Sequence, residues 1–167
     1  MVDNNTVKDS VIQKLIDQAD IIQTLNRFVL SIDSRDYAAM RDCLTDEINF
    51  DYSALFGAVM PSSADELVEN VRKNHAGFRA IQHLTANHIV TVDGDKATCT
   101  ANFAAQHFLP NERGGNLWAV GGRYDYQLMK IQKNWKIYGC KIHVSWTDGN
   151  LQLFDLAREQ SSITITG

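Results

Sequence analysis

The sequence lacks the features that mark several special classes of protein. Its 167 residues carry a net charge of −4 and no basic cluster, which argues against nucleic acid as a partner. No apolar run reaches fifteen residues and segment 1–10 is polar, so we expect neither a membrane span nor a secretory signal. Only three cysteines occur, Cys43, Cys99 and Cys140, without a paired metal-ligand spacing. Reduced, buried thiols in a cytoplasmic protein are their simplest interpretation.

What is present is the composition of one ordinary globular domain. Hydrophobic residues make up 44% of the chain and charged residues 22%, and no internal repeat, linker or low-complexity segment divides it. We therefore expect a single domain over residues 1–167, with residues 1–10 and 160–167 as candidate flexible ends.

The longest helical pattern covers Val11–Asp33. One face carries apolar residues at spacings of three and four, namely Ile12, Leu15, Ile16, Ala19, Ile22, Val29 and Leu30. A second stripe carries Ile21, Leu25, Phe28 and Ile32. A helix that is apolar on two sides is usually enclosed by its domain, so the carboxylate of Asp33, which continues the first face, needs a partner. Either Asp33 caps the Ser34–Asp36 turn, or it pairs with a group from elsewhere in the chain.

The remaining pattern changes from helical to strand-like after Gly77. Before it, we expect a short helix capped by Asp36, a strand over Glu47–Tyr52 and a helix started by a capping box of Ser63 and Glu66. After it, four long strands, a short helix and a tail or edge strand are expected over Ile81–Val92, Lys96–Leu109, Leu117–Lys133, Trp135–Trp146, Asn150–Arg158 and Ser161–Gly167. This order favours an α+β domain with helices on one face of the sheet. Strands of this length twist, so the sheet should wrap into a cone whose mouth admits a small apolar ligand.

Histidines lie on two of these strands. Alternation over Lys96–Leu109 places His107 at the end of the apolar face. Over Ile81–Val92, His83 and His88 fall on opposite faces of a regular strand, and periodicity does not decide which face lies inside. Opposite faces also argue against joint metal binding, so we expect no metal site.

A single inward histidine is usually a core residue, but two of them with a buried aspartate favour catalysis. A carboxylate that holds one imidazole nitrogen fixes the tautomer and leaves the other nitrogen as a general base.

Four short segments carry a resemblance to a known family. These segments are Ser31–Tyr37, Phe50–Tyr52, Gln82–His83 and Gln106–His107. Their order and separations resemble scytalone dehydratase and the SnoaL-like branch of the NTF2-like superfamily. The similarity covers nearly the whole chain. The resemblance implies a cone-shaped α+β barrel, with N-terminal helices packed on a strongly curved, mostly antiparallel sheet. It also implies eliminations, isomerisations or cyclisations without a cofactor.

Carried over onto matching positions, the resemblance implies that Asp33 and His83 form the dyad that abstracts a proton. His107 and Tyr52 are then the groups that hold a water or polarise a substrate oxygen. The chain departs from the family at Ile32, where scytalone dehydratase has a tyrosine, and around Gly122–Asp125, where a serine and an asparagine are missing. Elimination chemistry on a substrate other than scytalone is therefore expected.

Together, the residues and the resemblance predict a dehydratase-like lyase or an isomerase that acts on a small cyclic or aromatic carbonyl-type compound. The expected substrate-binding residues are Asn87, Phe50, Phe103, Val29 and Tyr124. Two other classes stay open. The cone could bind a small apolar molecule without turnover, which would fit best if Asp33 and His83 do not touch. Alternatively, the domain could serve only in association, with its pocket filled by side chains. A homo-oligomer, dimer or trimer, paired through the exposed sheet face is also expected.

Overall fold

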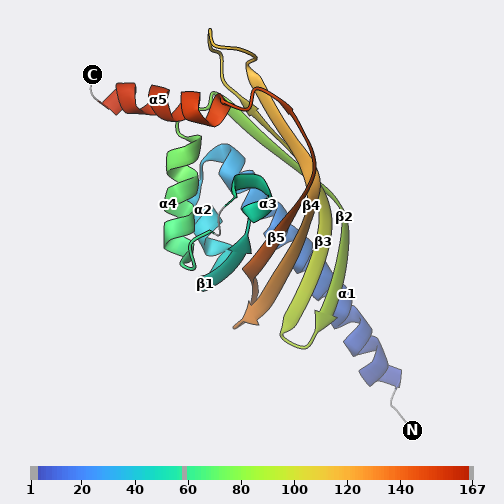
Figure 1. Cartoon of the computed structure of the whole chain (residues 1–167). Coiled ribbons are helices and arrows are strands. Elements are labelled where there is room, and N and C mark those ends of the chain that lie inside the picture. Colours follow the sequence, from blue (N-terminus) through green and yellow to red (C-terminus); the bar gives the residue numbers. More distant parts are fainter. Residues whose placement is uncertain (1–3, 58–59, 166–167) are drawn as a thin grey trace.

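A curved five-stranded sheet wraps around the helices of the first half of the chain (Figure 1). The computed structural model describes residues 4–57 and 60–165. In chain order its elements are α1 (Asn4–Ser34), α2 (Tyr37–Asp42), β1 (Leu44–Asp51), α3 (Ser53–Phe56), α4 (Ala64–His75), β2 (Ala80–Asp93), β3 (Lys96–Phe108), β4 (Leu117–Ile131), β5 (Asn134–Gly149) and α5 (Leu153–Ile165). The predicted α+β class, with helices before strands, is confirmed.

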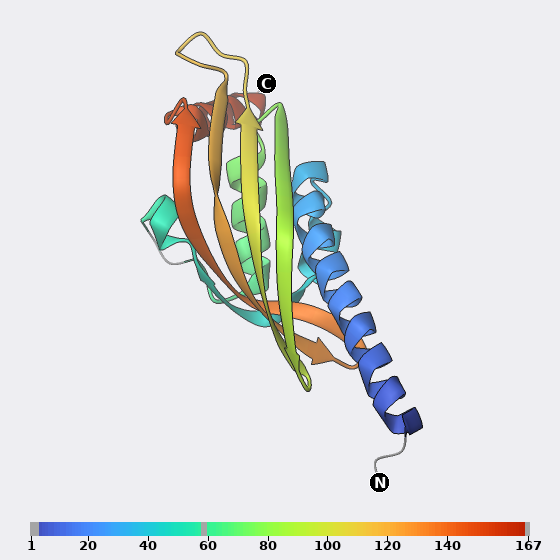
Figure 2. The same ribbon diagram turned by 90° about the vertical axis from the view of Figure 1, so that its right-hand side faces the viewer.

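The strands lie in the order β1-β5-β4-β3-β2. Strand β1 pairs parallel with β5, and the other three pairings are antiparallel. Helices α2, α3 and α4 lie on the concave side, and α5 crosses one end of the molecule (Figure 1). Seen from the convex side, α1 runs along the β2 edge of the sheet (Figure 2). This arrangement confirms the predicted cone with a mostly antiparallel, strongly curved sheet.

Helix α1 buries only one of its two predicted apolar faces. The second stripe is the buried one, and it consists of Ile21, Leu25, Phe28 and Ile32, joined by Val29. Ile12, Leu15 and Ile16 of the first face are exposed, because the N-terminal part of α1 extends past the end of the sheet (Figure 2). Within the described ranges, no helix combines the length and the apolar character needed to cross a membrane.

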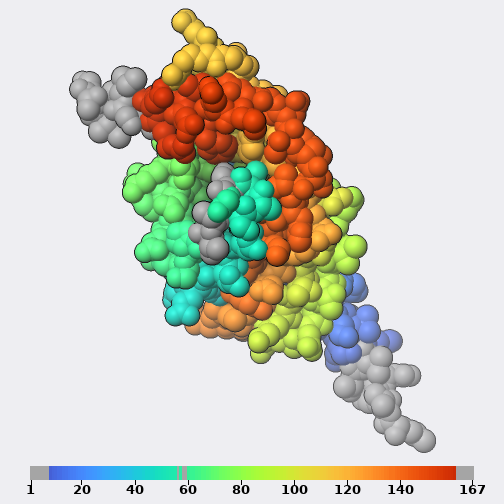
Figure 3. Space-filling model, viewed as in Figure 1, coloured from blue at the N-terminus to red at the C-terminus, as the bar shows by residue number. Residues whose placement is uncertain are grey.

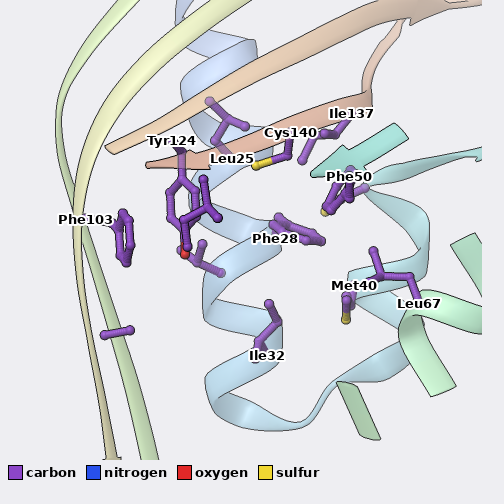
Figure 4. Packing of buried hydrophobic residues seen from close by; sticks show 14 of the residues in the cluster. Leu25, Phe28, Ile32, Met40, Phe50, Leu67, Phe103, Tyr124, Ile137 and Cys140 are labelled. Atoms are coloured by element: carbon purple, nitrogen blue, oxygen red, sulfur yellow. The ribbon is translucent and has the colours of Figure 1, made fainter. Parts of the chain in front are cut away.

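The core forms where the buried stripe of α1 meets β1, β5 and the neighbouring helices. Phe28 contacts Phe50 edge to face, with 6.1 Å between the ring centroids. Figure 4 shows the α1 side chains between two sheet residues, Phe103 and Tyr124, on one side and Met40 and Phe50 on the other. Burying each large side chain of this kind contributes about 1.5–3 kcal/mol to folding, so this contact positions α1 firmly against the sheet.

Several local predictions can be compared with the structure. The side chain of Asp36 accepts a hydrogen bond from the backbone N–H of Ala39 and caps α2, as predicted. Ser63 is the N-cap of α4, but its side chain makes no capping hydrogen bond, so the predicted capping box does not form. Residues 161–165 continue α5 instead of forming a tail or edge strand, and residues 166–167 lie outside the described part of the chain.

A bulge in β2 changes which residues face inward. The pairing with β3 shifts between Ala86 and Ile89, and Asn87 has a φ of 58°, in the left-handed region. One extra residue reverses the alternation, so His83 before the bulge and His88 after it share the inner face. The expectation that these two histidines face opposite sides was wrong, because it assumed a regular strand.

Gly122 should be intolerant of any side chain, because β5 approaches it closely. A Cβ atom added there would lie 1.9 Å from the backbone oxygen of His143. We expect Gly122→Ala to lower the free energy of unfolding by about 1–3 kcal/mol or more, as an overpacked site does. Gly115→Ala is the matched control, since its Cβ would meet only Asn150 at 3.9 Å. Chemical denaturation of both variants measures the effect, and equal midpoints for the two would contradict it.

Candidate active site

The end of α1 delivers Asp33 to the edge of β2. Arg35 has a φ of 59°, and the backbone N–H of Asp36 donates to the carbonyl of Ser31 at 2.9 Å, which is the hydrogen bond of a Schellman-type helix end. The Arg35 guanidinium also donates to the backbone carbonyl of Phe78, just before β2. The helix therefore stops immediately after Asp33 and is tied to the start of the neighbouring strand.

Asp33 and His83 make a two-point contact. Oδ1 of Asp33 lies 2.6 Å from Nδ1 of His83, and Oδ2 accepts the backbone N–H of His83 at 2.8 Å. Their side chains are 14% and 10% exposed. Because an ionised carboxylate only accepts, Nδ1 of His83 carries the proton and Nε2 of the neutral ring is free to take one. Asp33 therefore pairs with a distant residue, and it is Asp36 that caps the following helix.

A cavity of about 650 Å³ opens beside this pair, within the range of small-molecule sites. It is lined by the predicted residues His83, His107, Tyr52, Phe50, Phe103, Val29 and Tyr124. The side chains of the cone therefore leave an open space. Helix α5 also contributes to the cavity wall, through Phe154, Asp155 and Arg158. This helix lies across one end of the molecule (Figure 3).

Asn87 is the predicted site residue that the structure places elsewhere. It is exposed at the β2 bulge and does not line the cavity, so its assignment to the substrate-binding residues is corrected. Leu84, three residues before it, is also exposed. The inner face of β2 near the cavity consists instead of Ile81, His83 and Thr85.

Two tyrosines bring hydroxyl groups to the cavity wall. The Tyr52 hydroxyl lies 3.7 Å from the sulfur of Cys140, and Phe103 stacks on Tyr124 with 4.1 Å between the ring centroids. Burial raises the pKa of Tyr52 and of Tyr124 well above the ordinary value. Both hydroxyls therefore stay protonated at neutral pH and can donate hydrogen bonds.

His107 lies next to His83, with 6.0 Å between the ring centroids. Its Nε2 is 3.4 Å from Nε2 of His75, a cavity residue that the sequence did not suggest. Burial lowers the pKa of His107 to about 2 and that of His75 to about 4. His75 could have been found, because it continues the inner face of α4 four residues after Val71, which itself follows the buried Leu67 by four.

A second Asp–His contact lies outside the cavity. Nε2 of His143 is 2.8 Å from Oδ2 of Asp125, and the two side chains are 38% and 39% exposed. Neither residue lines the cavity. The described residues thus include a sheltered and a more exposed pair of the same chemistry. Across residues 4–57 and 60–165, no three His, Cys, Asp or Glu side chains gather in a way that could hold a metal ion.

Comparisons with solved structures find proteins of the same fold. A protein of Kribbella flavida, Kfla4162, superposes with a TM-score of 0.79 at 27% identity, covering 87% of this chain and 99% of its own. A candidate scytalone dehydratase of Novosphingobium aromaticivorans gives 0.74 at 16% identity, with 84% and 91% covered. A hexachlorocyclohexane dehydrochlorinase, LinA-type3, of Novosphingobium barchaimii gives 0.68 at 14% identity, with 84% and 94% covered. No curated protein matches the chain in sequence at a significant level.

A family model gives the most specific of these results. The model of the SnoaL-like domain matches residues 13–141, which include the end of α1 with Asp33 and the strands that carry His83 and His107. Structures similar to this chain include dehydratase-type and dehydrochlorinase-type proteins. The chain therefore belongs to the SnoaL-like domain family, which has the NTF2-like fold.

Proposed function

We propose that the protein is a cofactor-independent lyase or isomerase of the dehydratase type. In this proposal, Nε2 of His83 removes a proton next to the carbonyl of a small cyclic or aromatic compound. The observation that carries the proposal is the 2.6 Å contact between Asp33 and His83 beside an open cavity. The dehydratase and dehydrochlorinase neighbours support elimination as the reaction type.

For a cyclic β-hydroxy ketone, the proposed steps balance as follows. The proton on the carbon next to the carbonyl moves to Nε2 of His83, and its electron pair forms an enolate. The enolate then closes the carbon–carbon double bond while the carbon–oxygen bond of the β-hydroxyl breaks. The proton held by His83 passes to that oxygen, so water leaves and the histidine returns to its neutral form. The carboxylate of Asp33 stabilises the imidazolium that exists between these steps.

Tyr52 is the proposed donor to the enolate oxygen. Its hydroxyl stays protonated and lies at the cavity wall, and a donor already aimed at a developing negative charge gains strength where water is excluded. Phe50 and Tyr124 hold its ring, with centroid distances of 5.8 Å and 6.3 Å. This packing orients the hydroxyl before substrate arrives.

The residues of the cavity wall also favour the proposal that the substrate is not scytalone. Ile32 lines the cavity directly before Asp33, so the wall is apolar where scytalone dehydratase presents a tyrosine. Gly122 of β4 contributes no side chain opposite Phe103. Fewer polar partners at these two places favour a substrate with fewer oxygen substituents.

The dyad is tested with 3-hydroxy-1-tetralone, a cyclic β-hydroxy ketone that becomes 1-naphthol when it loses water. We expect Asp33→Asn and His83→Ala each to lower kcat/KM by about 10²–10⁴, the usual contribution of general-base catalysis. Asp125→Asn and His143→Ala are matched controls, because they alter the exposed Asp–His pair. The formation of 1-naphthol is followed by absorbance, and circular dichroism confirms that each variant is folded.

Equal loss of activity in both pairs of variants would point to a general effect on the protein and remove the dyad from the mechanism. Tight binding of the ketone by the wild-type protein without any turnover of β-hydroxy or β-halo ketones would replace catalysis with small-molecule binding.

Tyr52→Phe separates stabilisation of the enolate from removal of the proton. We expect kcat to fall by roughly 10²-fold, as when one oxyanion donor is lost, while KM changes little. Tyr138→Phe is the control, because Tyr138 does not line the cavity. A Tyr52→Phe enzyme with unchanged kcat would show that another group holds the oxygen.

A further inference from the structure

Tyr124 presents an unpaired hydroxyl group to the cavity. Its side chain lies on the inner face of β4 and lines the cavity wall, and no group of the described residues makes a hydrogen bond with its hydroxyl. The hydroxyl of Tyr126, further along β4, is also unpaired, but it has less than 1 Å² of accessible surface. The hydroxyl of Tyr124 is not enclosed in this way. A ligand in the cavity can therefore reach it.

The ring of Tyr124 leans toward the side of the cavity where His83 lies. Phe103 of β3 is paired with Gly122 and not with Tyr124, yet its ring stacks on that of Tyr124 with 4.1 Å between the centroids. The two rings therefore lean together over Gly122, where a Cβ atom would lie only 3.2 Å from the ring of Phe103. Figure 4 shows both rings facing α1. Since β3 lies between β4 and β2, this lean brings the hydroxyl closer to His83.

The carboxylate of Asp33 also acts on this hydroxyl. Burial is the largest cause that raises the pKa of Tyr124, and the Cys140 thiol and the negative charge of Asp33 raise it further. The interaction of two charges weakens with distance, so this effect agrees with a hydroxyl on the dyad side of the cavity. The hydroxyl of Tyr52, in contrast, lies against the sulfur of Cys140 at 3.7 Å.

In the proposed reaction, the oxygen that leaves must lie beside the dyad. The proton that His83 takes from carbon passes to this oxygen, which therefore has to come within hydrogen-bond reach of Nε2. The carbonyl group, whose oxygen Tyr52 holds in the proposal, is attached to the other side of the carbon that loses the proton. The leaning hydroxyl of Tyr124 is thus the one placed for the oxygen at the β position.

We infer that Tyr124 binds the β-oxygen of the substrate and is a further catalytic residue, which donates a hydrogen bond to that oxygen as it leaves. The binding statement stands without catalysis, while the catalytic part rests on the proposed function. Tyr124 keeps its own proton, because the proton that completes the water molecule comes from His83. A halide leaves without taking up a proton, and its diffuse charge gains less from a hydrogen bond than the compact charge of an oxygen. Tyr124 therefore favours loss of water over loss of halide.

Two ketones that differ only in the leaving group test this role, 3-hydroxy-1-tetralone and 3-chloro-1-tetralone, since both give 1-naphthol. We expect Tyr124→Phe to lower kcat about 10²-fold for the hydroxy ketone, as when one oxyanion donor is lost, and by no more than about threefold for the chloro ketone. Tyr52→Phe should lower kcat for both ketones by a similar factor, because both pass through the same enolate.

Tyr126→Phe is the matched control, because it removes a hydroxyl that is enclosed and out of reach of a ligand. It should change kcat for neither ketone, and circular dichroism confirms that each variant is folded. A Tyr124→Phe variant that loses activity by the same factor on both ketones, or on neither, would overturn the catalytic role.

Binding separates this inference from the proposed function. Neither 1,3-dihydroxynaphthalene nor 1-naphthol can undergo elimination, and they differ in the oxygen at the β position. We expect the wild-type protein and Tyr126→Phe to bind the dihydroxy compound about tenfold more tightly than 1-naphthol, and Tyr124→Phe to reduce this preference to about twofold or less. An equal preference in the wild-type protein and Tyr124→Phe would overturn the inference. The expected binding pattern without turnover of either ketone would instead contradict the proposed function and leave Tyr124 as a ligand-binding residue.

Discussion

The structure depends on one constraint, which is that a largely buried carboxylate at the end of α1 must be satisfied. Asp33 meets it with two hydrogen bonds from a single residue of β2, one from the ring of His83 and one from its backbone. The same two bonds that join the first helix to the sheet therefore orient the imidazole. Structural and chemical roles coincide here, since removing the carboxylate would loosen the helix end and free the ring at once.

The cavity is lined by residues of α1, α4, α5 and the strands of the sheet. Long antiparallel strands curve around α1 and α4. The bulge at Asn87 reverses the alternation of β2, so polar residues of this strand face inward near α1 while its outer face stays exposed. The walls are mostly aromatic, and burial holds the tyrosine hydroxyls and the two paired histidines neutral. In the cavity wall His83 thus lies next to the neutral ring of His107, beside the carboxylate that holds it.

The sequence was informative where periodicity and order carry the information. The long strands, the helix that ends at Asp33, and the meeting of Asp33 with His83 were all predictable from spacing and the family resemblance. The side of β2 was not, because a single bulge residue reverses the alternation and puts Asn87 outside. The position of His75 on the inner face of α4 was readable from spacing, but its contact with His107 was not, because that contact joins α4 to β3 and no local pattern encodes it. The exposed residues Ile12, Leu15 and Ile16 of α1 show that an apolar face predicts a contact without identifying the surface that makes it.

The central claim is that His83 acts as a general base, and exchange of carbon-bound protons with solvent tests it without any leaving group. 1-Tetralone has acidic protons next to its carbonyl but no β-hydroxyl to lose. In deuterated buffer, the account predicts that the wild-type protein accelerates deuterium incorporation at that carbon, measured by proton NMR, and that His83→Ala does not. Exchange that proceeds equally fast with His83→Ala, or no faster with the wild-type protein than in buffer alone, would contradict it.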